Sequence, residues 1–119
     1  TVLIWPFEKN LGSVYSAAIA TIVPSINETF GRVVIESGFY GTPVIVRDIQ
    51  PLSELIEHGK NGLIWDGSKE HLLKLTESLL NDREYRDCLG ENLRQKVLRD
   101  FSDRKYAESV KAVVLGKER

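Results

Sequence analysis

Short apolar runs recur along the chain, and polar or glycine-containing segments separate them. The runs are rich in valine and isoleucine, and polar residues do not alternate with the apolar ones. Runs of this kind are typical of strands that are covered on both faces, as in a parallel sheet. The pattern predicts four strands, at Val2–Trp5, Thr21–Val23, Val44–Val46 and Leu63–Trp65.

Helical patterns lie between these runs and after the last one. Their apolar residues recur every three or four positions, which is the spacing of one helix face. Ser68 and Ser102 stand where two of these helices need an N-cap. The predicted helices are Leu11–Ala20, Arg32–Tyr40, Leu52–Glu57, Lys69–Asn81, Arg83–Arg99 and about Asp103–Leu115. In the fourth of them, the residues expected on one apolar face are Leu72, Leu75, Leu79 and Leu80.

Strands and helices alternate through most of the chain, which indicates an open α/β sheet with right-handed crossovers. We therefore predict a Rossmann-like α/β fold, in which an open, mostly parallel sheet carries helices on both faces. The two C-terminal helices have no strand between them. We expect them to pack across an edge of the sheet or to extend beyond it.

Composition narrows the classes of protein to consider. The 119 residues are enough for one domain, or part of one, with a real core. A net charge of −1 without a cluster of lysine or arginine predicts no nucleic-acid partner. The single cysteine, Cys88, cannot form an internal disulfide, which favours a reducing compartment and a cytoplasmic location. Cys88 shares the apolar side of its helix with Tyr85 and Leu89, so we expect it to be buried.

The first residues of the chain already resemble a buried strand, and the sequence contains no methionine. Because a domain rarely begins inside its sheet, we expect residues 1–119 to be a fragment of a longer polypeptide. No apolar run approaches the roughly 20 residues that a transmembrane helix needs. No signal peptide is recognisable.

The segment 25-SINETFG-31, followed by a helix, is the most promising place for a ligand. Ligands of open α/β sheets bind beyond the C-terminal ends of the strands. A glycine lets the backbone approach a ligand, and the first helical turn offers unpaired amides and a partial positive charge. We therefore predict a site for an anion such as phosphate, with the amides of Phe30, Gly31 and Arg32 as hydrogen-bond donors. The Arg32 side chain adds a positive charge there.

Two glutamates flank this turn. Glu36 stands in the apolar run of a predicted helix, where a carboxylate needs an ion pair or hydrogen bonds. It suits two adjacent hydroxyls, as in a ribose or hexose, but spacing alone equally allows it to face solvent or to pair with Arg32. Glu28 precedes the helix. Taken alone, it is better explained as a negative charge that interacts favourably with the partial positive charge of the helix N-terminus than as a catalytic residue.

The chain resembles the donor-binding half of retaining GT-B glycosyltransferases, especially family 4. The resemblance rests on the order and combination of motifs, which cover nearly the whole chain, more than on the pair of glutamates eight positions apart. The motifs are 14-VYSAAIATIVPS-25, 28-ETFG-31, 33-VVIE-36, 41-GTPVIV-46, 54-ELIEHGKNGLIW-65 and 89-LGENLRQKVLRDFS-102.

The resemblance implies transfer of a sugar from a nucleotide-diphosphate sugar to an acceptor, with retained anomeric configuration. It implies that Glu36 binds the ribose hydroxyls and that Glu28, the candidate catalytic residue, contacts the transferred sugar near the reacting carbon. It implies that the amides of the Glu-x-Phe-Gly turn hold the diphosphate. The expected donor-binding residues are Ser25, Asn27, Thr29, Phe30, Gly31, Arg32 and Glu36. No cofactor and no bound metal are expected, and His58 and His71 are interpreted as surface or turn residues.

The sequence also departs from the family pattern. In the loop 48-DIQPLSE-54, only Asp48 and Glu54 match, and Phe39 and Tyr40 replace small residues before Gly41. The first strands of the donor-binding domain, with their basic pair, and the N-terminal acceptor domain do not fall within these residues. We therefore expect residues 1–119 to be a partial donor-binding domain that has little or no activity alone. Acceptor binding, and any peripheral membrane association, would belong to the N-terminal domain.

Two other functions remain open at this point. A sugar-nucleotide epimerase of the same GT-B architecture would also bind a sugar nucleotide but would need no acceptor. A non-catalytic α/β interaction module, similar to a receiver domain, would need an acidic cluster at the ends of the first strands, which the sequence lacks. The combination of Glu-x-Phe-Gly with Gly-Thr-Pro favours the transferase.

Overall fold

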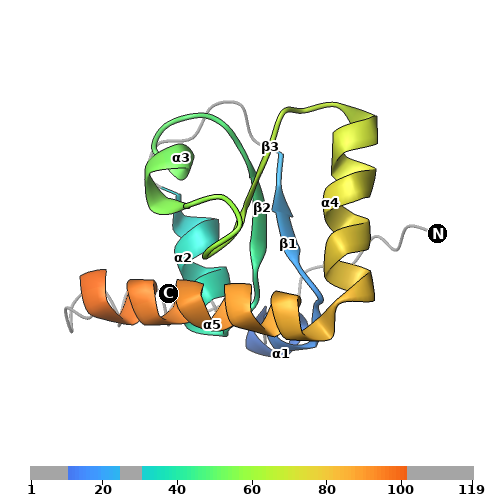
Figure 1. The fold of residues 1–119 in the computed structure, drawn as a ribbon. Helices are drawn as coiled ribbons and strands as arrows, with labels where there is room; N and C mark the ends of the chain where they lie inside the picture. Colours follow the sequence, from blue (N-terminus) through green and yellow to red (C-terminus); the bar gives the residue numbers. More distant parts are fainter. Residues whose placement is uncertain (1–10, 25–30, 102–119) are drawn as a thin grey trace.

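Within the part of the chain that the structure describes, three parallel strands form a sheet, in the order β1-β2-β3 (Figure 1). The computed structural model describes residues 11–24 and 31–101. Its strands are β1 (Thr21–Val23), β2 (Val44–Arg47) and β3 (Leu63–Trp65), and Ile45 at the centre pairs with both neighbouring strands. These three strands were predicted, and β2 is one residue longer than expected. The predicted strand Val2–Trp5 lies outside the described residues.

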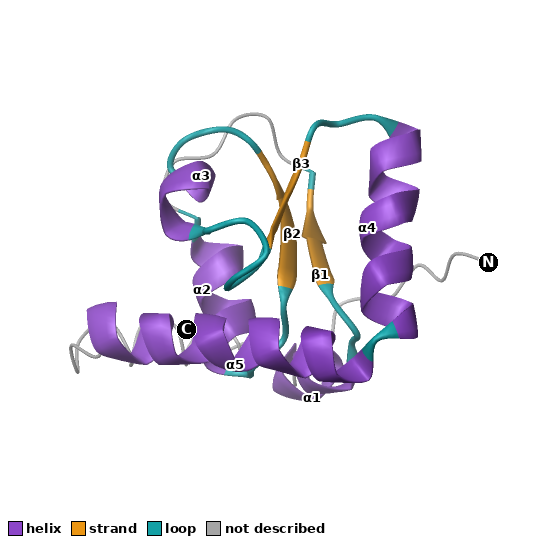
Figure 2. Ribbon diagram, viewed as in Figure 1, coloured by secondary structure: helices purple, strands orange, loops and turns teal. Residues whose placement is uncertain are grey.

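Helices cover both faces of the sheet, as Figure 2 shows, so the Rossmann-like α/β prediction is confirmed. Helices α2 and α3 pack on one face and α4 on the other, while α5 runs past the end of the sheet and packs against α2. The predicted helix Asp103–Leu115 and its Ser102 cap lie outside the described residues. The helices are α1 (Leu11–Ala17), α2 (Arg32–Phe39), α3 (Leu52–Leu55), α4 (Lys69–Asn81) and α5 (Arg83–Asp100).

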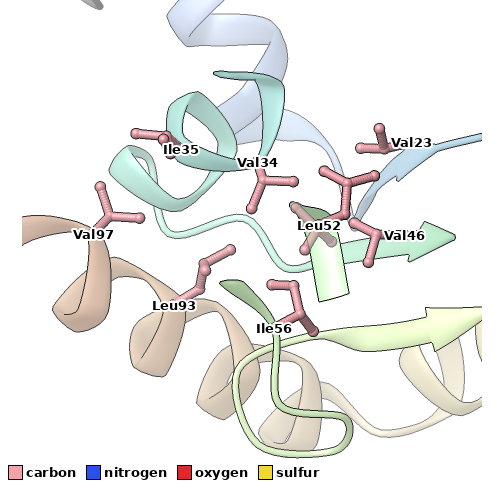
Figure 3. Packing of buried hydrophobic residues seen from close by; sticks show 9 residues of the cluster. Val23, Val34, Ile35, Val46, Leu52, Ile56, Leu93 and Val97 are labelled. Atoms are coloured by element: carbon pink, nitrogen blue, oxygen red, sulfur yellow. The ribbon is translucent and has the colours of Figure 1, made fainter. Parts of the chain in front are cut away.

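The larger core lies between the sheet, α2, α3 and α5, and Figure 3 shows its side chains converging. Gly38 allows α5 to approach α2 closely, because a Cβ atom at this position would lie 2.7 Å from Val97 Cγ2 and 2.8 Å from Leu93 Cγ. The helix that carries Glu36 is therefore fixed on two sides, by the sheet and by α5. The fully buried members of this core include Val34, Ile35, Val44, Val46, Leu52 and Leu93.

The second core lies on the opposite face, beneath α4. Leu75 and Leu79 of α4 are buried there as predicted, but Leu80 is 53% exposed and Leu72 is only partly buried. The predicted apolar face of α4 was therefore too wide. As predicted, Ser68 caps this helix: its hydroxyl oxygen accepts the amide of His71 at 3.1 Å.

Cys88 of α5 is exposed, which corrects the prediction that it is buried. The buried residues of α5 are Leu89, Gly90, Leu93 and Val97, a stripe that repeats every three or four positions. Cys88 lies one position before this stripe and so faces about 100° away from Leu89 around the helix axis. Within residues 11–24 and 31–101, the helices are too short or too polar to cross a membrane.

Candidate functional site

The structure describes three of the predicted site residues: Gly31, Arg32 and Glu36. All three belong to the start of α2 or its second turn. The remaining candidates lie outside the described residues, so their roles stay predictions: Ser25, Asn27, Glu28, Thr29 and Phe30.

Gly31 immediately precedes α2, at the edge of the sheet where the strands end. It is the N-cap residue, with a φ of 76° in the left-handed region that favours glycine. A Cβ atom on Gly31 would lie 2.8 Å from Leu55 Cδ1 of α3, the helix that follows the end of β2. The backbone conformation and the contact with α3 therefore both require glycine here.

The first amides of α2 suit an anion. Gly31 has no side-chain oxygen, so the N-cap residue cannot accept a hydrogen bond from the first helical amides with its side chain. The partial positive charge of the helix N-terminus adds to these donors. Arg32, which is exposed at the first helical position, adds a full positive charge.

Glu36 is buried, with only 3% of its surface exposed. Its Oε1 accepts a hydrogen bond from the Tyr15 hydroxyl at 3.2 Å. Its Oε2 is also buried and has no hydrogen-bond partner among the residues that the structure describes. The interpretation of Glu36 as a solvent-facing charge is therefore wrong.

The surroundings of Glu36 act on its pKa in both directions. Burial raises the pKa of the carboxyl group, and this effect prevails over two opposing ones. The hydrogen bond from Tyr15 and the positive charge of Arg32 both lower the pKa, because they stabilise the carboxylate. Burial, together with the nearby Glu36 charge, also raises the pKa of Tyr15 and of Tyr40.

Tyr15 of α1 is held in place by residues around the end of α2. Its ring stacks on that of Tyr40, with the centroids 5.8 Å apart and the planes inclined by 6°. Phe39 contacts Tyr40 edge to face, with centroids 5.7 Å apart. The Thr42 hydroxyl donates a hydrogen bond to the carbonyl oxygen of Tyr15 at 2.5 Å. Tyr15 therefore meets Glu36 from a fixed position.

Sequence reasoning missed this role of Tyr15. The resemblance included Tyr15 in the motif 14-VYSAAIATIVPS-25 but gave it no partner. The two residues are 21 positions apart and lie on different helices, so helical spacing does not connect them. The available signal was indirect: a buried glutamate needs a donor, and tyrosine is one of the few side chains that brings a donor into an apolar setting.

The two histidines hold turns together, as expected. Nδ1 of His58 accepts the amide of Ile64 at 2.9 Å, and Nδ1 of His71 accepts the amide of Asp66 at 3.0 Å. At the end of β2, Arg47 lies over the Trp65 ring, 5.4 Å from its centroid. Arg47 therefore contacts the neighbouring strand β3.

Comparison with known proteins gives a consistent result. Residues 2–96 match the profile of the family described as glycosyl transferases group 1. A curated relative, the D-inositol 3-phosphate glycosyltransferase of Corynebacterium glutamicum, is 40% identical over 85 residues, which are 71% of this chain and 20% of the relative. The chain spans about a fifth of the length of the curated relatives that it matches.

Two solved structures share the fold. Sucrose-phosphate synthase from Thermosynechococcus elongatus superimposes with a TM-score of 0.73 and 31% identity, over 84% of this chain and 25% of the synthase. HepE of Anabaena, solved in complex with UDP and glucose, superimposes with a TM-score of 0.71 over 86% of this chain and 29% of HepE. HepE is 22% identical, so it supports the fold alone.

Proposed function

This chain belongs to the glycosyl transferases group 1 family, and we propose that it forms part of the donor site of a retaining glycosyltransferase. The donor is a nucleotide-diphosphate sugar. The oxygen of an acceptor hydroxyl bonds to the anomeric carbon and loses its proton, and the bond from that carbon to the diphosphate breaks, which releases a nucleoside diphosphate. The site is of the family-4 type, in which the two glutamates, Glu28 and Glu36, both contact the donor. The relatives named above are glycosyltransferases or a sugar-phosphate synthase, which supports this reaction over epimerisation.

The observation that carries the proposal is the Oε2 of Glu36, which is buried and has no hydrogen-bond partner among the described residues. A buried carboxylate oxygen without a hydrogen-bond donor destabilises the folded state. A glutamate at such a position is therefore better explained by a role in ligand binding than by a role in stability. The hydroxyls of a ribose are suitable donors for it. Residues 31 and 36 are five positions apart, which corresponds to about 7.5 Å along the helix axis. Glu36 is thus set back from the anion-binding end of α2, as the ribose of a nucleotide is set back from its diphosphate.

The amides at Gly31 and Arg32, with the Arg32 charge, would hold the diphosphate. Negative charge builds on this group as its bond to the sugar breaks, and a fixed helix N-terminus stabilises that charge without having to reorganise. The resemblance gives Thr29 and Phe30 a share in this turn and places Glu28 at the transferred sugar. Ser25 and Asn27 complete the proposed donor-binding residues.

The remaining parts of the proposal concern the whole protein. Acceptor binding is assigned to another part of the polypeptide, so we expect residues 1–119 alone to have little or no transferase activity. No metal ion or cofactor is needed in this scheme. The protein works in the cytoplasm, and any contact with a membrane surface comes from the acceptor-binding part.

The test is turnover by the intact protein with a panel of UDP-, GDP- and ADP-sugars. Release of nucleoside diphosphate that depends on an acceptor, with a product of the same anomeric configuration as the donor, supports the proposal. An altered sugar nucleotide formed without an acceptor would instead identify an epimerase. Absence of both binding and turnover for every donor would leave the interaction module as the better account.

A further inference from the structure

We propose that Tyr15 is a positioning residue for donor binding, which holds Oε1 of Glu36 so that Oε2 remains directed at the ribose hydroxyls. This inference rests on the proposed function, because it assumes that Glu36 binds the donor. It assigns a task to a residue of α1, a helix outside the pair-of-glutamates motif.

The two oxygens of Glu36 are unequal. The Tyr15 hydroxyl donates to Oε1 at 3.2 Å, whereas Oε2 is buried and has no partner among the described residues. A carboxylate free at both oxygens would rotate between several orientations and would have to be ordered when the ligand binds. With Oε1 held, the carboxylate plane is set in advance and only one oxygen is left for the ligand.

The surroundings of Tyr15 fix its hydroxyl. Its ring stacks on Tyr40, which caps the C-terminal end of the helix that carries Glu36. Its carbonyl oxygen accepts the Thr42 hydroxyl, so the backbone of α1 is hydrogen-bonded to the segment between α2 and β2. The stacking and the backbone contact both survive removal of the phenolic oxygen. Tyr15→Phe therefore isolates the hydrogen bond.

The hydrogen bond also affects the charge of Glu36. Among the described residues, three groups interact with this carboxylate: the Tyr15 hydroxyl from α1, Arg32 one turn earlier on α2, and Tyr40 at the C-cap of α2. Tyr15 and Arg32 stabilise the ionised form, and burial opposes them. Loss of the Tyr15 hydroxyl removes one stabilising contact, so the pKa of Glu36 rises further. Binding that requires the carboxylate then fails at a higher pH.

The experiment measures nucleotide affinity in the intact protein by calorimetry. UDP, GDP and ADP are titrated first, and the tightest binder is then compared with its 2′-deoxy and 3′-deoxy forms. The variants are Tyr15→Phe, Glu36→Gln and, as a matched control, Tyr85→Phe, which loses a tyrosine hydroxyl in the other core. Each titration is repeated from pH 5 to pH 8, and thermal unfolding confirms that each variant is folded.

Wild-type protein is expected to bind the ribonucleotide more tightly than at least one deoxy form, and Glu36→Gln to lose this preference. Tyr15→Phe should weaken ribonucleotide binding about tenfold, the effect of one hydrogen bond to a charged group. It should leave deoxynucleotide affinity nearly unchanged and move the acid midpoint of binding to higher pH. Tyr85→Phe should behave like the wild type in both respects.

Three results would overturn the inference in distinguishable ways. If Glu36→Gln loses the ribose preference but Tyr15→Phe keeps it with an unshifted pH profile, the role of Tyr15 is wrong and the donor site stands. If the wild type shows no ribose preference, or if Glu36→Gln retains that preference, the ribose role of Glu36 is wrong. The proposed role of Tyr15 is then wrong as well, because it depends on Glu36. An equal loss in Tyr85→Phe would show that the effect of Tyr15→Phe is not specific.

Discussion

Gly38 of α2 lies so close to Leu93 of α5 that a Cβ atom on the glycine would come within 2.8 Å of Leu93 Cγ. The same Cβ atom would lie 2.7 Å from Val97 Cγ2. Both contacts are with fully or almost fully buried side chains of the larger core, which have little room to move. The position of the helix that carries Glu36 therefore depends on a residue without a side chain.

Gly38→Ala is accordingly expected to lower the free energy of unfolding by about 1–3 kcal/mol, the range for overpacking a tight core. Chemical denaturation of the intact protein measures it. The matched variant is Gly38→Ala combined with Leu93→Ala, which makes room for the new methyl group. The double variant should lose less stability than the sum of the two single losses. Simple additivity would show that the two residues do not compete for space.

Ser37 supports the same helix through a buried hydrogen bond. Its Oγ is hydrogen-bonded to the carbonyl oxygen of Thr42 at 2.8 Å and to Thr21 Oγ1 at 2.9 Å. Ser37→Ala leaves the Thr42 carbonyl group without this donor, so we expect a loss of about 1–2 kcal/mol. Ser78→Ala is the control, because the Ser78 hydroxyl donates to the Leu75 carbonyl oxygen in the preceding turn of its own helix, and this change should alter stability by less than about 0.5 kcal/mol. Equal losses would contradict this account.

The pH dependence of stability should reveal the strain at Glu36. Burial raises the pKa of this carboxyl in the folded state, so the folded state holds its proton to a higher pH than the unfolded chain. The free energy of unfolding therefore falls as pH rises from the ordinary glutamate pKa of about 4.3 through the higher folded value. Glu36→Gln removes this titration.

Glu36→Gln should consequently be more stable than the wild type at pH 7, by on the order of 1 kcal/mol. At pH 4 the advantage should shrink, because the wild-type carboxyl group is then largely neutral in both states. Urea denaturation at the two pH values measures the difference. A difference that does not grow between pH 4 and pH 7 would mean that the buried carboxylate does not weaken the fold.

Much of this fold was predictable because its signals are local. The apolar runs at residues 21–23, 44–46 and 63–65 and the cap at Ser68 depend on neighbouring residues, and they were placed correctly. The end of α1 was predicted at Ala20, but the helix ends at Ala17. Alanines 17, 18 and 20 favour a longer helix, but the chain must leave the helix to form the bond from the Thr21 amide to the Pro43 carbonyl oxygen, at 2.9 Å.

The site was predictable only in part, for a related reason. The glycine at the start of α2 and the unusual glutamate in an apolar run are visible in the sequence. The partner of that glutamate is not, because Tyr15 reaches it only once α1 and α2 are packed together. Cys88 was wrongly predicted to be buried. The four-residue spacing of Tyr85, Leu89 and Leu93 identifies the centre of the buried face of α5, but it does not show whether that face extends toward Cys88 or toward Gly90.

The two glutamates should affect kinetics differently. In the intact enzyme, Glu36→Ala should mainly raise KM for the donor, because it removes a contact made in both the ground state and the transition state. Glu28→Ala should mainly lower kcat, because the resemblance places Glu28 at the reacting carbon. Steady-state kinetics with saturating acceptor separates the two parameters. If neither substitution changes KM or kcat, neither glutamate contacts the donor, and both proposed roles are wrong.

The most direct test of the central claim is a crystal structure of the intact protein with a bound nucleoside diphosphate, in which the distance from Glu36 Oε2 to the ribose hydroxyl oxygens is measured. We predict that one hydroxyl lies about 2.5–3.0 Å from Oε2, a normal hydrogen-bond distance, while the Tyr15 hydroxyl remains on Oε1. A bound ribose whose hydroxyls contact other residues, with Oε2 still unpartnered, would contradict the proposed role of Glu36.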